Sequence, residues 1–272
     1  GIEGGLVLVT ADDPGMHSSQ NEQDSRFYAD FARVPCFEPA DHQEAYRMTR
    51  EAFDLSEKFH VPVVIKLVTR LAHSRGIVRR DEPRGENSID RITEINRWIL
   101  APANARVNWE ILQDQQKPMA EYAAGSPFNS LTLSPSFTEY GVITTGLGRN
   151  YYMENLPDLP GRPSHLHIGA YPVPVDMVKK LFGSVKSVFI FEEGYPFVES
   201  KLTGIFGAPV PVRGKLTGDV PRSGELTPDT VRKALGLPAR KAKEAPKLPL
   251  PGRPPQLCKG CPHGDKIGRA HV

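Results

Sequence analysis

The chain has few cysteines, no long apolar run and no excess of one charge. Three cysteines in 272 residues are too few for the disulfide framework of a secreted domain, so we expect a reducing, cytoplasmic location. The longest apolar stretch, residues 61–68, is interrupted by Lys66, and none is long enough to span a bilayer. Lys and Arg number 34 against 32 Asp and Glu, a balance that indicates neither a nucleic-acid partner nor an anionic membrane.

Both ends of the sequence are unusual. The first residue is Gly1 rather than Met, and an apolar strand pattern begins almost at once. At the other end, residues 267–272 resemble the translation of a common short-read sequencing adapter. We therefore expect a fragment truncated at both ends, with native sequence stopping near Lys266, and we leave 267–272 out of all fold reasoning.

What is present is an alternation of strand and helix patterns. Residues 6–11 and 62–69 are short apolar runs rich in β-branched side chains, and each predicts a buried strand. Between them, Asp41 and Glu44 form a capping-box-like pair that opens a helix to residue 59. A strand, a helix and a strand in this order predict a right-handed crossover in a parallel sheet.

An earlier helix is expected from Ser18 or Ser19, as its cap, to about residue 33. Its inner face would carry Phe27, Phe31 and Val34. A charged surface excursion follows at 81–87, and a polar helix at 103–122 leads to a second unit.

The second unit repeats the alternation. We expect strands at 140–146, 165–169 and 185–191, and helices at 175–182 and from Thr227 to just before Gly236. Gly183 is expected as the residue that ends the first of these helices. Residues 238–255 contain six prolines and five basic residues and read as a stiff linker.

The densest polar stretch is residues 12–24, directly after the first strand. Ligands of open α/β sheets bind at the carboxyl ends of strands, so this stretch is a candidate site for a heterocycle or a carboxylate. Its candidate binding residues are His17, Ser19, Gln20, Asn21, Gln23 and Asp24. The alternative is a solvated loop in which one Ser or Asp merely caps a helix.

A second candidate lies at the end of the 62–69 strand, where Arg70, His73, Ser74 and Arg75 follow. If the two strands are neighbours, both polar loops open on the same edge of the sheet. A 2-oxo acid needs a cation for its carboxylate and a donor for its keto oxygen, which Arg70 and His73 could supply. The alternative is a basic surface loop, or arginines that pair with acids of the neighbouring loop.

Four further patterns are weaker. His165 and His167 have the spacing of two zinc ligands on one strand face, but an ordinary strand is favoured because no third ligand is evident. The glycines at 146 and 148 indicate a strand-to-helix turn, because the third glycine of a dinucleotide fingerprint is missing. Glu192 and Glu193 could form a carboxylate pair, although the Pro and aromatic residues around them favour an interface with the next domain. Cys258 and Cys261 supply half a ligand set, so we expect no metal site in this chain.

Several segments in the same order resemble the alpha subunit of indolepyruvate ferredoxin oxidoreductases. The most specific is GGLVLVTADDPGMHSSQNEQDSR at 4–26. The others are at 69–76, 102–105, 171–174, 191–199, 224–228 and 257–263. The resemblance covers nearly the whole chain up to Lys266.

The resemblance implies an α/β fold with defined domains. Residues 1–101 would be the second half of a thiamine-diphosphate pyrimidine-binding domain, a parallel sheet flanked by helices, and 102–122 a helical connector. Residues 123–237 would be a transketolase-C-terminal-like domain, 238–256 the linker and 257–266 the start of a diphosphate-binding domain. There, His263 would line the diphosphate site.

The implied reaction is oxidative decarboxylation of indolepyruvate and other aryl-2-oxo acids to acyl-coenzyme A, with ferredoxin as electron acceptor. It implies thiamine diphosphate, magnesium and iron–sulfur clusters in the intact enzyme, and a smaller beta subunit as partner. The resemblance would place the catalytic Glu before Gly1 and the metal motif after Lys266, so we expect the chain alone to be inactive and to bind no cofactor. Two alternatives stay open: another 2-oxo acid, such as pyruvate or a branched-chain one, and a non-catalytic α/β assembly module.

Overall fold

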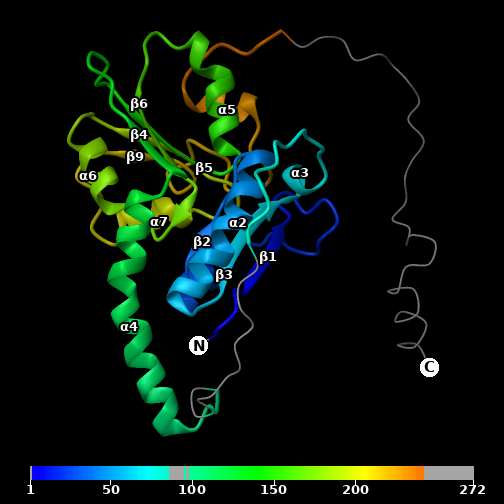
Figure 1. The fold of residues 1–272 in the computed structure, drawn as a ribbon. Coiled ribbons are helices and arrows are strands. Elements are labelled where there is room, and N and C mark those ends of the chain that lie inside the picture. Colours follow the sequence, from blue (N-terminus) through cyan, green and yellow to red (C-terminus); the bar gives the residue numbers. More distant parts are fainter. Residues whose placement is uncertain (1, 86–94, 96–97, 242–272) are drawn as a thin grey trace. The chain divides into compact units, whose positions relative to one another are not determined.

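The computed structural model describes residues 2–85, 95 and 98–241 (Figure 1). Residues 1–239 form one unit, which carries all the elements named below. Residues 242–256 of the expected linker, the expected diphosphate-domain start and residues 267–272 lie outside the described residues, and so do Cys258, Cys261 and His263.

The first sheet contains four strands in the order β1-β3-β2-β7. β1 (Val7–Asp12) and β3 (Val63–Val68) run parallel with Asp12 opposite Val68, which confirms the predicted strand–helix–strand crossover. β2 (Cys36–Phe37) is parallel to β3, and β7 (Ala170–Tyr171) joins β2 in the antiparallel sense. Because β7 comes from the second half of the chain, the two halves share this sheet.

The predicted burial is right for β3 and wrong for β1. β3 has neighbours on both sides and buries all but one of its residues. β1 is the edge strand, and Leu8 and Val9 are 54% and 56% exposed. An apolar run alone cannot distinguish an edge strand from a central one, because both have the same local pattern.

Helix α1 (Arg26–Ala32) begins later than expected. Residues 18–25 stay outside it because the carboxylates of Asp12 and Asp13 accept hydrogen bonds from their backbone. The expected inner face is only partly right. Val34 packs against the core, but Phe27 and Phe31 are exposed, and the buried positions of the helix are Arg26 and Ala29.

Helix α2 (His42–Phe59) begins as predicted. Asp41 Oδ1 accepts a hydrogen bond from Glu44 N at 2.8 Å, and Glu44 Oε2 accepts one from Ala40 N at 2.8 Å. Its apolar face packs against the first sheet (Figure 1). α3 (Thr69–Ala72) is a single turn after β3, and α4 (Pro102–Gly125) extends the predicted polar helix.

The second sheet has the order β4-β6-β5-β8-β9, parallel except for the β4–β6 pair. Its strands are β4 (Asn129–Thr132), β5 (Gly141–Thr145), β6 (Ser164–Ile168), β8 (Val188–Phe191) and β9 (Val212–Arg213). The accompanying helices are α5 (Gly148–Asn155), the 3-10 turn η2 (Leu156–Asp158), α6 (Val175–Phe182), α7 (Phe197–Thr203) and α8 (Pro228–Ala234). The predicted α/β class, with helices beside mostly parallel sheets, is confirmed.

The turns of the second half follow the expected chemistry. Gly148 lies so close to the backbone of Phe191 that a Cβ there would be 2.4 Å from Phe191 O. This close approach fits the predicted strand-to-helix turn. Thr227 caps α8 through a capping box with Thr230. Gly183 directly follows the last residue of α6, as predicted. Within the described ranges, every helix is too short or too polar to cross a membrane.

Candidate functional site

The two polar loops lie at one edge of the first sheet, because β1 and β3 end side by side. Thr69 Oγ1, at the end of β3, donates hydrogen bonds to Asp12 O at 3.1 Å and to Asp13 Oδ1 at 2.7 Å. The expected juxtaposition of residues 12–24 and 70–75 is therefore observed.

Asp13 organises the first loop. Its Oδ2 accepts hydrogen bonds from Ser18 N at 2.8 Å and Ser19 N at 2.9 Å. Burial opposes ionisation, but the hydrogen bonds from Ser18, Thr69 and Ser19 hold the pKa of Asp13 well below its usual range. The loop is thus folded around a fixed negative charge, and neither serine caps α1.

Arg70 and His17 meet across the two loops at a third residue, Glu225. Arg70 Nη2 lies 2.6 Å and His17 Nε2 3.2 Å from the same atom, Glu225 Oε2. The Arg70 guanidinium also lies 5.4 Å from the centre of the Tyr151 ring. The expected alternative, pairing of arginines with acids of the neighbouring loop, does not describe Arg70.

The remaining residues of the second loop are exposed. His73 ends α3 and its side chain faces solvent. Ser74 Oγ lies 3.1 Å from His42 Nε2, and Arg75 is exposed on the following segment. His73 therefore stands one helical turn from Arg70 on the same loop.

The other candidate residues of the first loop differ in where their side chains lie. Gln20 is exposed, and Gln23 Nε2 donates to Asn21 Oδ1 at 2.8 Å. Asp24 instead turns inward: it is 4% exposed and binds Arg26, with Arg26 Nε at 2.8 Å from its Oδ1. Asp24 belongs to a buried charge network rather than to the open edge.

That network centres on Arg26, whose side chain is fully buried. Its guanidinium contacts Asp24, Glu192 Oε2 at 2.9 Å and Glu38 Oε2 at 3.5 Å, and donates to the backbone oxygen of Glu193 at 2.8 Å. Despite burial, the carboxylates of Asp24 and Glu38 raise the pKa of Arg26 well above its ordinary value.

A second buried cation, Lys66, extends the network. Lys66 Nζ lies 3.0 Å from Glu38 Oε1, and Tyr171 OH donates to Glu38 Oε2 at 2.7 Å. Burial raises the pKa of Glu38, but Lys66 and Arg26 outweigh that effect and lower it. These contacts join β3 and α1 to β7, so the network ties the two halves of the chain together.

Glu192 and Glu193 both lie in this region. The carboxylate of Glu192 accepts hydrogen bonds from Val198 N at 2.9 Å and Glu199 N at 3.0 Å, at the start of α7. Its other partner is Arg26, in the N-terminal half of the chain. The next domain, with which an interface is expected, lies outside the described residues. Glu193 is 1% exposed and accepts hydrogen bonds from Leu226 N at 3.2 Å.

The pKa of Glu193 predicts a pH-dependent stability. Burial raises this pKa to about 7, opposed by the Leu226 hydrogen bond and by Lys66. Below pH 4.5 both the folded and the unfolded chain hold the proton; between pH 4.5 and 7 only the folded chain does. Stability contributed by Glu193 is therefore lost as pH rises through this window, by up to about 3 kcal/mol.

We expect Glu193→Gln to remove that loss, because an amide oxygen can still accept the Leu226 hydrogen bond. Urea unfolding of wild type and variant between pH 4 and 8 measures it. The variant should have the higher free energy of unfolding, and the difference from wild type should increase with pH up to neutrality. A constant gap across this range would contradict a raised pKa at Glu193.

His165 and His167 form a separate buried pair. Thr144 Oγ1 lies 2.8 Å from His165 Nε2 and 3.0 Å from His167 Nδ1. Burial lowers the pKa of His165 to about 3 and that of His167 to about 4, so both rings are neutral at pH 7. Among the residues that the structure describes, no cluster of three or more His, Cys, Asp or Glu could hold a metal ion.

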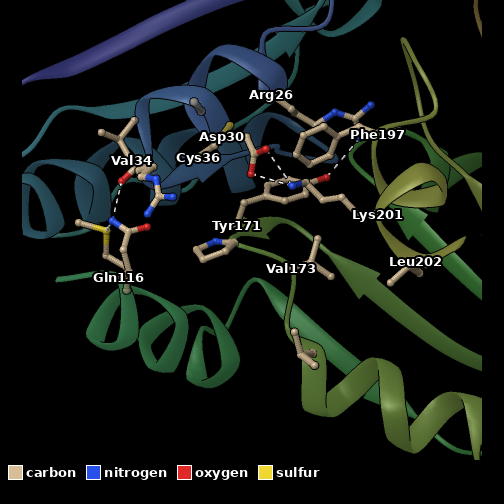
Figure 2. A pocket seen from close by; sticks show the side chains of 15 residues that line it. Arg26, Asp30, Val34, Cys36, Gln116, Tyr171, Val173, Phe197, Lys201 and Leu202 are labelled. Carbon is tan, nitrogen blue, oxygen red and sulfur yellow. Dashed lines mark hydrogen bonds and ion pairs between the residues drawn. The ribbon is translucent and has the colours of Figure 1, made fainter. Parts of the chain in front are cut away.

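A cavity of about 430 Å³ is lined in part by Arg26 (Figure 2). It is bounded by α1, the C-terminal part of α4, residues 171–175 and α7. Figure 2 shows Asp30 and Lys201 side by side at this cavity, with Lys201 Nζ 2.8 Å from both carboxylate oxygens. Its remaining walls are mostly apolar, so it offers less acid–base chemistry than the loop edge.

Sequence reasoning missed Glu225 and the buried network. Glu225 lies 155 residues from Arg70 in the chain, and no local pattern marks it as a partner. Arg26 sits in the most specific segment of the sequence, and an arginine on the inner face of a helix could have signalled a buried ion pair.

No protein-family model matches the chain. Indolepyruvate oxidoreductase subunit IorA of Methanothermobacter thermautotrophicus is 37% identical over 275 residues, which cover 97% of this chain and 44% of that subunit. IorA of Archaeoglobus fulgidus is 37% identical over 279 residues, with the same shares of 97% and 44%. The chain thus spans less than half the length of the curated relatives it matches.

Among solved structures, the 2-oxoglutarate:ferredoxin oxidoreductase of Magnetococcus marinus has a similar fold. The TM-score is 0.57 at 14% identity, over 84% of this chain and 48% of that one. This likeness concerns the fold alone. On the strength of the sequence identities, the chain belongs, over the segment that it spans, to the family of indolepyruvate oxidoreductase subunit IorA.

Proposed function

We propose that the chain is part of the large subunit of an enzyme that oxidatively decarboxylates indolepyruvate and other aryl-2-oxo acids. The observation that carries the proposal is the meeting of Arg70 and His17 at Glu225, at the carboxyl edge of the first sheet, in a chain 37% identical to IorA. Ligands of open α/β sheets bind at this kind of edge.

In this proposal the chain's residues hold and polarise the substrate. Arg70 binds the carboxylate of the 2-oxo acid through a charge-assisted hydrogen bond. His73, exposed one turn further on, donates to the keto oxygen, where negative charge develops as a nucleophile adds to the keto carbon. Asp13 keeps the first loop in place through its bonds to Ser18, Ser19 and Thr69.

Thiamine diphosphate would supply the nucleophile and the electron sink for decarboxylation. The described residues fit only part of it. The neutral groups of Ser19, Gln20, Asn21 and Gln23 suit a heterocycle, whereas magnesium with a diphosphate needs an oxygen-ligand cluster that the described ranges do not contain. We therefore assign this chain the substrate side of the site, and the diphosphate, magnesium and iron–sulfur clusters to the rest of the intact enzyme.

The proposal includes a smaller beta subunit, ferredoxin and coenzyme A as partners, and a cytoplasmic location. The name of the relatives, a subunit, supports the first of these. Exposed apolar side chains also favour subunit contacts: Phe31 is 91%, Trp109 54% and Phe206 101% exposed. The same exposure supports the second candidate function, a module that serves assembly without taking part in the reaction.

A chimera tests the proposal. Residues 1–239 replace the matching segment of IorA from Methanothermobacter thermautotrophicus, and the product is assembled with its partner subunit. We expect ferredoxin reduction that depends on indolepyruvate. A pure assembly module would allow the complex to form without turnover, so size-exclusion chromatography must accompany the assay.

The same chimera, assayed with pyruvate in place of indolepyruvate, tests which class of 2-oxo acid is the substrate. We expect indolepyruvate to be preferred over pyruvate and over a branched-chain 2-oxo acid. An assembled complex that oxidises none of the three acids would refute the proposal that this segment takes part in catalysis.

A further inference from the structure

Glu225 binds two basic side chains of the loop edge, Arg70 and His17, at a single oxygen atom. Its Oε2 is 2.6 Å from Arg70 Nη2 and 3.2 Å from His17 Nε2. The Glu225 side chain is only 16% exposed, whereas those of Arg70 and His17 are 39% and 53% exposed. The carboxylate is thus the inner partner, and the side chains of Arg70 and His17 remain reachable from solvent.

The backbone around Glu225 is anchored on both sides. Leu226 N donates to the carboxylate of Glu193 at 3.2 Å. On the other side, Gly224 N donates to Glu22 Oε1, which also accepts a hydrogen bond from Gly15 N at 2.8 Å. Segment 224–226 is therefore held against the loop of residues 12–24, and the Glu225 carboxylate has a fixed place beside Arg70 and His17.

We propose that Glu225 is a tethered carboxylate that competes with the carboxylate of the 2-oxo acid for Arg70 and His17. The inference rests on the function proposed above for Arg70. A carboxylate of the chain and a carboxylate of the substrate offer the same acceptor atoms to the same donors.

The competition sets a threshold for binding. A substrate acid must exchange one carboxylate for another at Arg70, so its net gain is the difference between two similar interactions. A neutral analogue gains nothing from the exchange, and a simple anion gains little. Discrimination then depends on the remaining contacts of the substrate, which favours acids with a large side chain.

Removing the charge of Glu225 tests the idea on the full 272-residue chain. The probe is indole-3-acetate, a stable aryl monocarboxylate, titrated by ligand-observed NMR. We expect Glu225→Gln to bind it about tenfold more tightly than wild type, the equivalent of one charge-assisted hydrogen bond. Glu225→Asp, which is one methylene shorter, should give a smaller gain in the same direction.

Two controls decide the cause of a gain. Asp219 precedes Glu225 by six residues in the chain and pairs with Arg213 at 2.6 Å, so Asp219→Asn removes an equal charge away from the loops. It should leave the affinity unchanged, and the double variant Glu225→Gln/Arg70→Gln should lose the gain. Equal affinity of Glu225→Gln and wild type, or an equal gain in Asp219→Asn, would overturn the proposal.

The titration contains no catalytic step, so its outcome is separate from that of the chimera assay. A gain in affinity for indole-3-acetate in Glu225→Gln, together with an inactive chimera, would support the tethered carboxylate and refute the proposed reaction. An active chimera with no gain would leave the reaction standing and refute the tether.

Discussion

Replacing Arg26 by Met is expected to lower the free energy of unfolding by about 3–5 kcal/mol, the usual cost of removing one partner from a buried ion network. The Arg26 side chain is fully buried and contacts Asp24, Glu38 and Glu192, whose side chains are at most 3% exposed. Without the guanidinium, Lys66 is the cation left beside Glu38. Asp24 and Glu192 would keep backbone hydrogen bonds but lose their ion pair.

Arg33 provides the matched control. It ends the same helix, its Nη1 donates to Gln113 Oε1 at 2.7 Å, and its guanidinium lies 5.5 Å from the Trp109 ring. Because Arg33 is exposed, Arg33→Met should cost less than about 1 kcal/mol. The loss of stability in Arg26→Lys should lie between those of the two Met variants, since lysine keeps the charge but lacks the planar set of donors of a guanidinium.

Urea unfolding followed by circular dichroism measures all three variants. Should Arg26→Met not accumulate as a folded protein, Arg26→Lys still tests the idea. Stabilities of Arg26→Met and Arg33→Met that agree within 1 kcal/mol would refute a structural role for the network.

The sequence predicts those parts of the fold that carry their own local pattern. α2 has a cap and an apolar stripe, β3 is a buried run of β-branched residues, and α6 is amphipathic; each is found where expected. β2 and β7 were not predicted, because strands of two residues are too short to show a period. Yet these two strands connect the halves of the chain.

The candidate site follows the same division. The joint position of the two polar loops was predictable, since parallel neighbours bring their carboxyl ends to one edge. The partners of the loop residues were not. Arg26 meets Glu192 across 166 residues of chain and Arg70 meets Glu225 across 155, distances at which no spacing rule applies. Asp24 was therefore expected in the open loop, although its partner directs it into the interior.

In the active chimera, His73 and Arg70 are expected to contribute to different kinetic constants. His73 is proposed to stabilise charge that develops only in the transition state, so His73→Ala should lower turnover by about 10²–10³. Arg70 holds substrate and transition state about equally, so Arg70→Ala should mainly raise the Michaelis constant for indolepyruvate, by about tenfold. Both changes are expected on a fold that is nearly unaffected.

The structure gives a reason for that last expectation. His73 is exposed, and the ion pair of Arg70 with Glu225 involves an arginine side chain that is 39% exposed, so its loss should cost less than about 1 kcal/mol. Melting temperatures should stay within a few degrees of the parent chimera. If the two residues only tie loops together, each variant should instead melt markedly lower while its folded fraction turns over normally. Steady-state kinetics and thermal melts on the same preparations separate the two cases, and normal kinetics with a lowered melt would remove both residues from the substrate site.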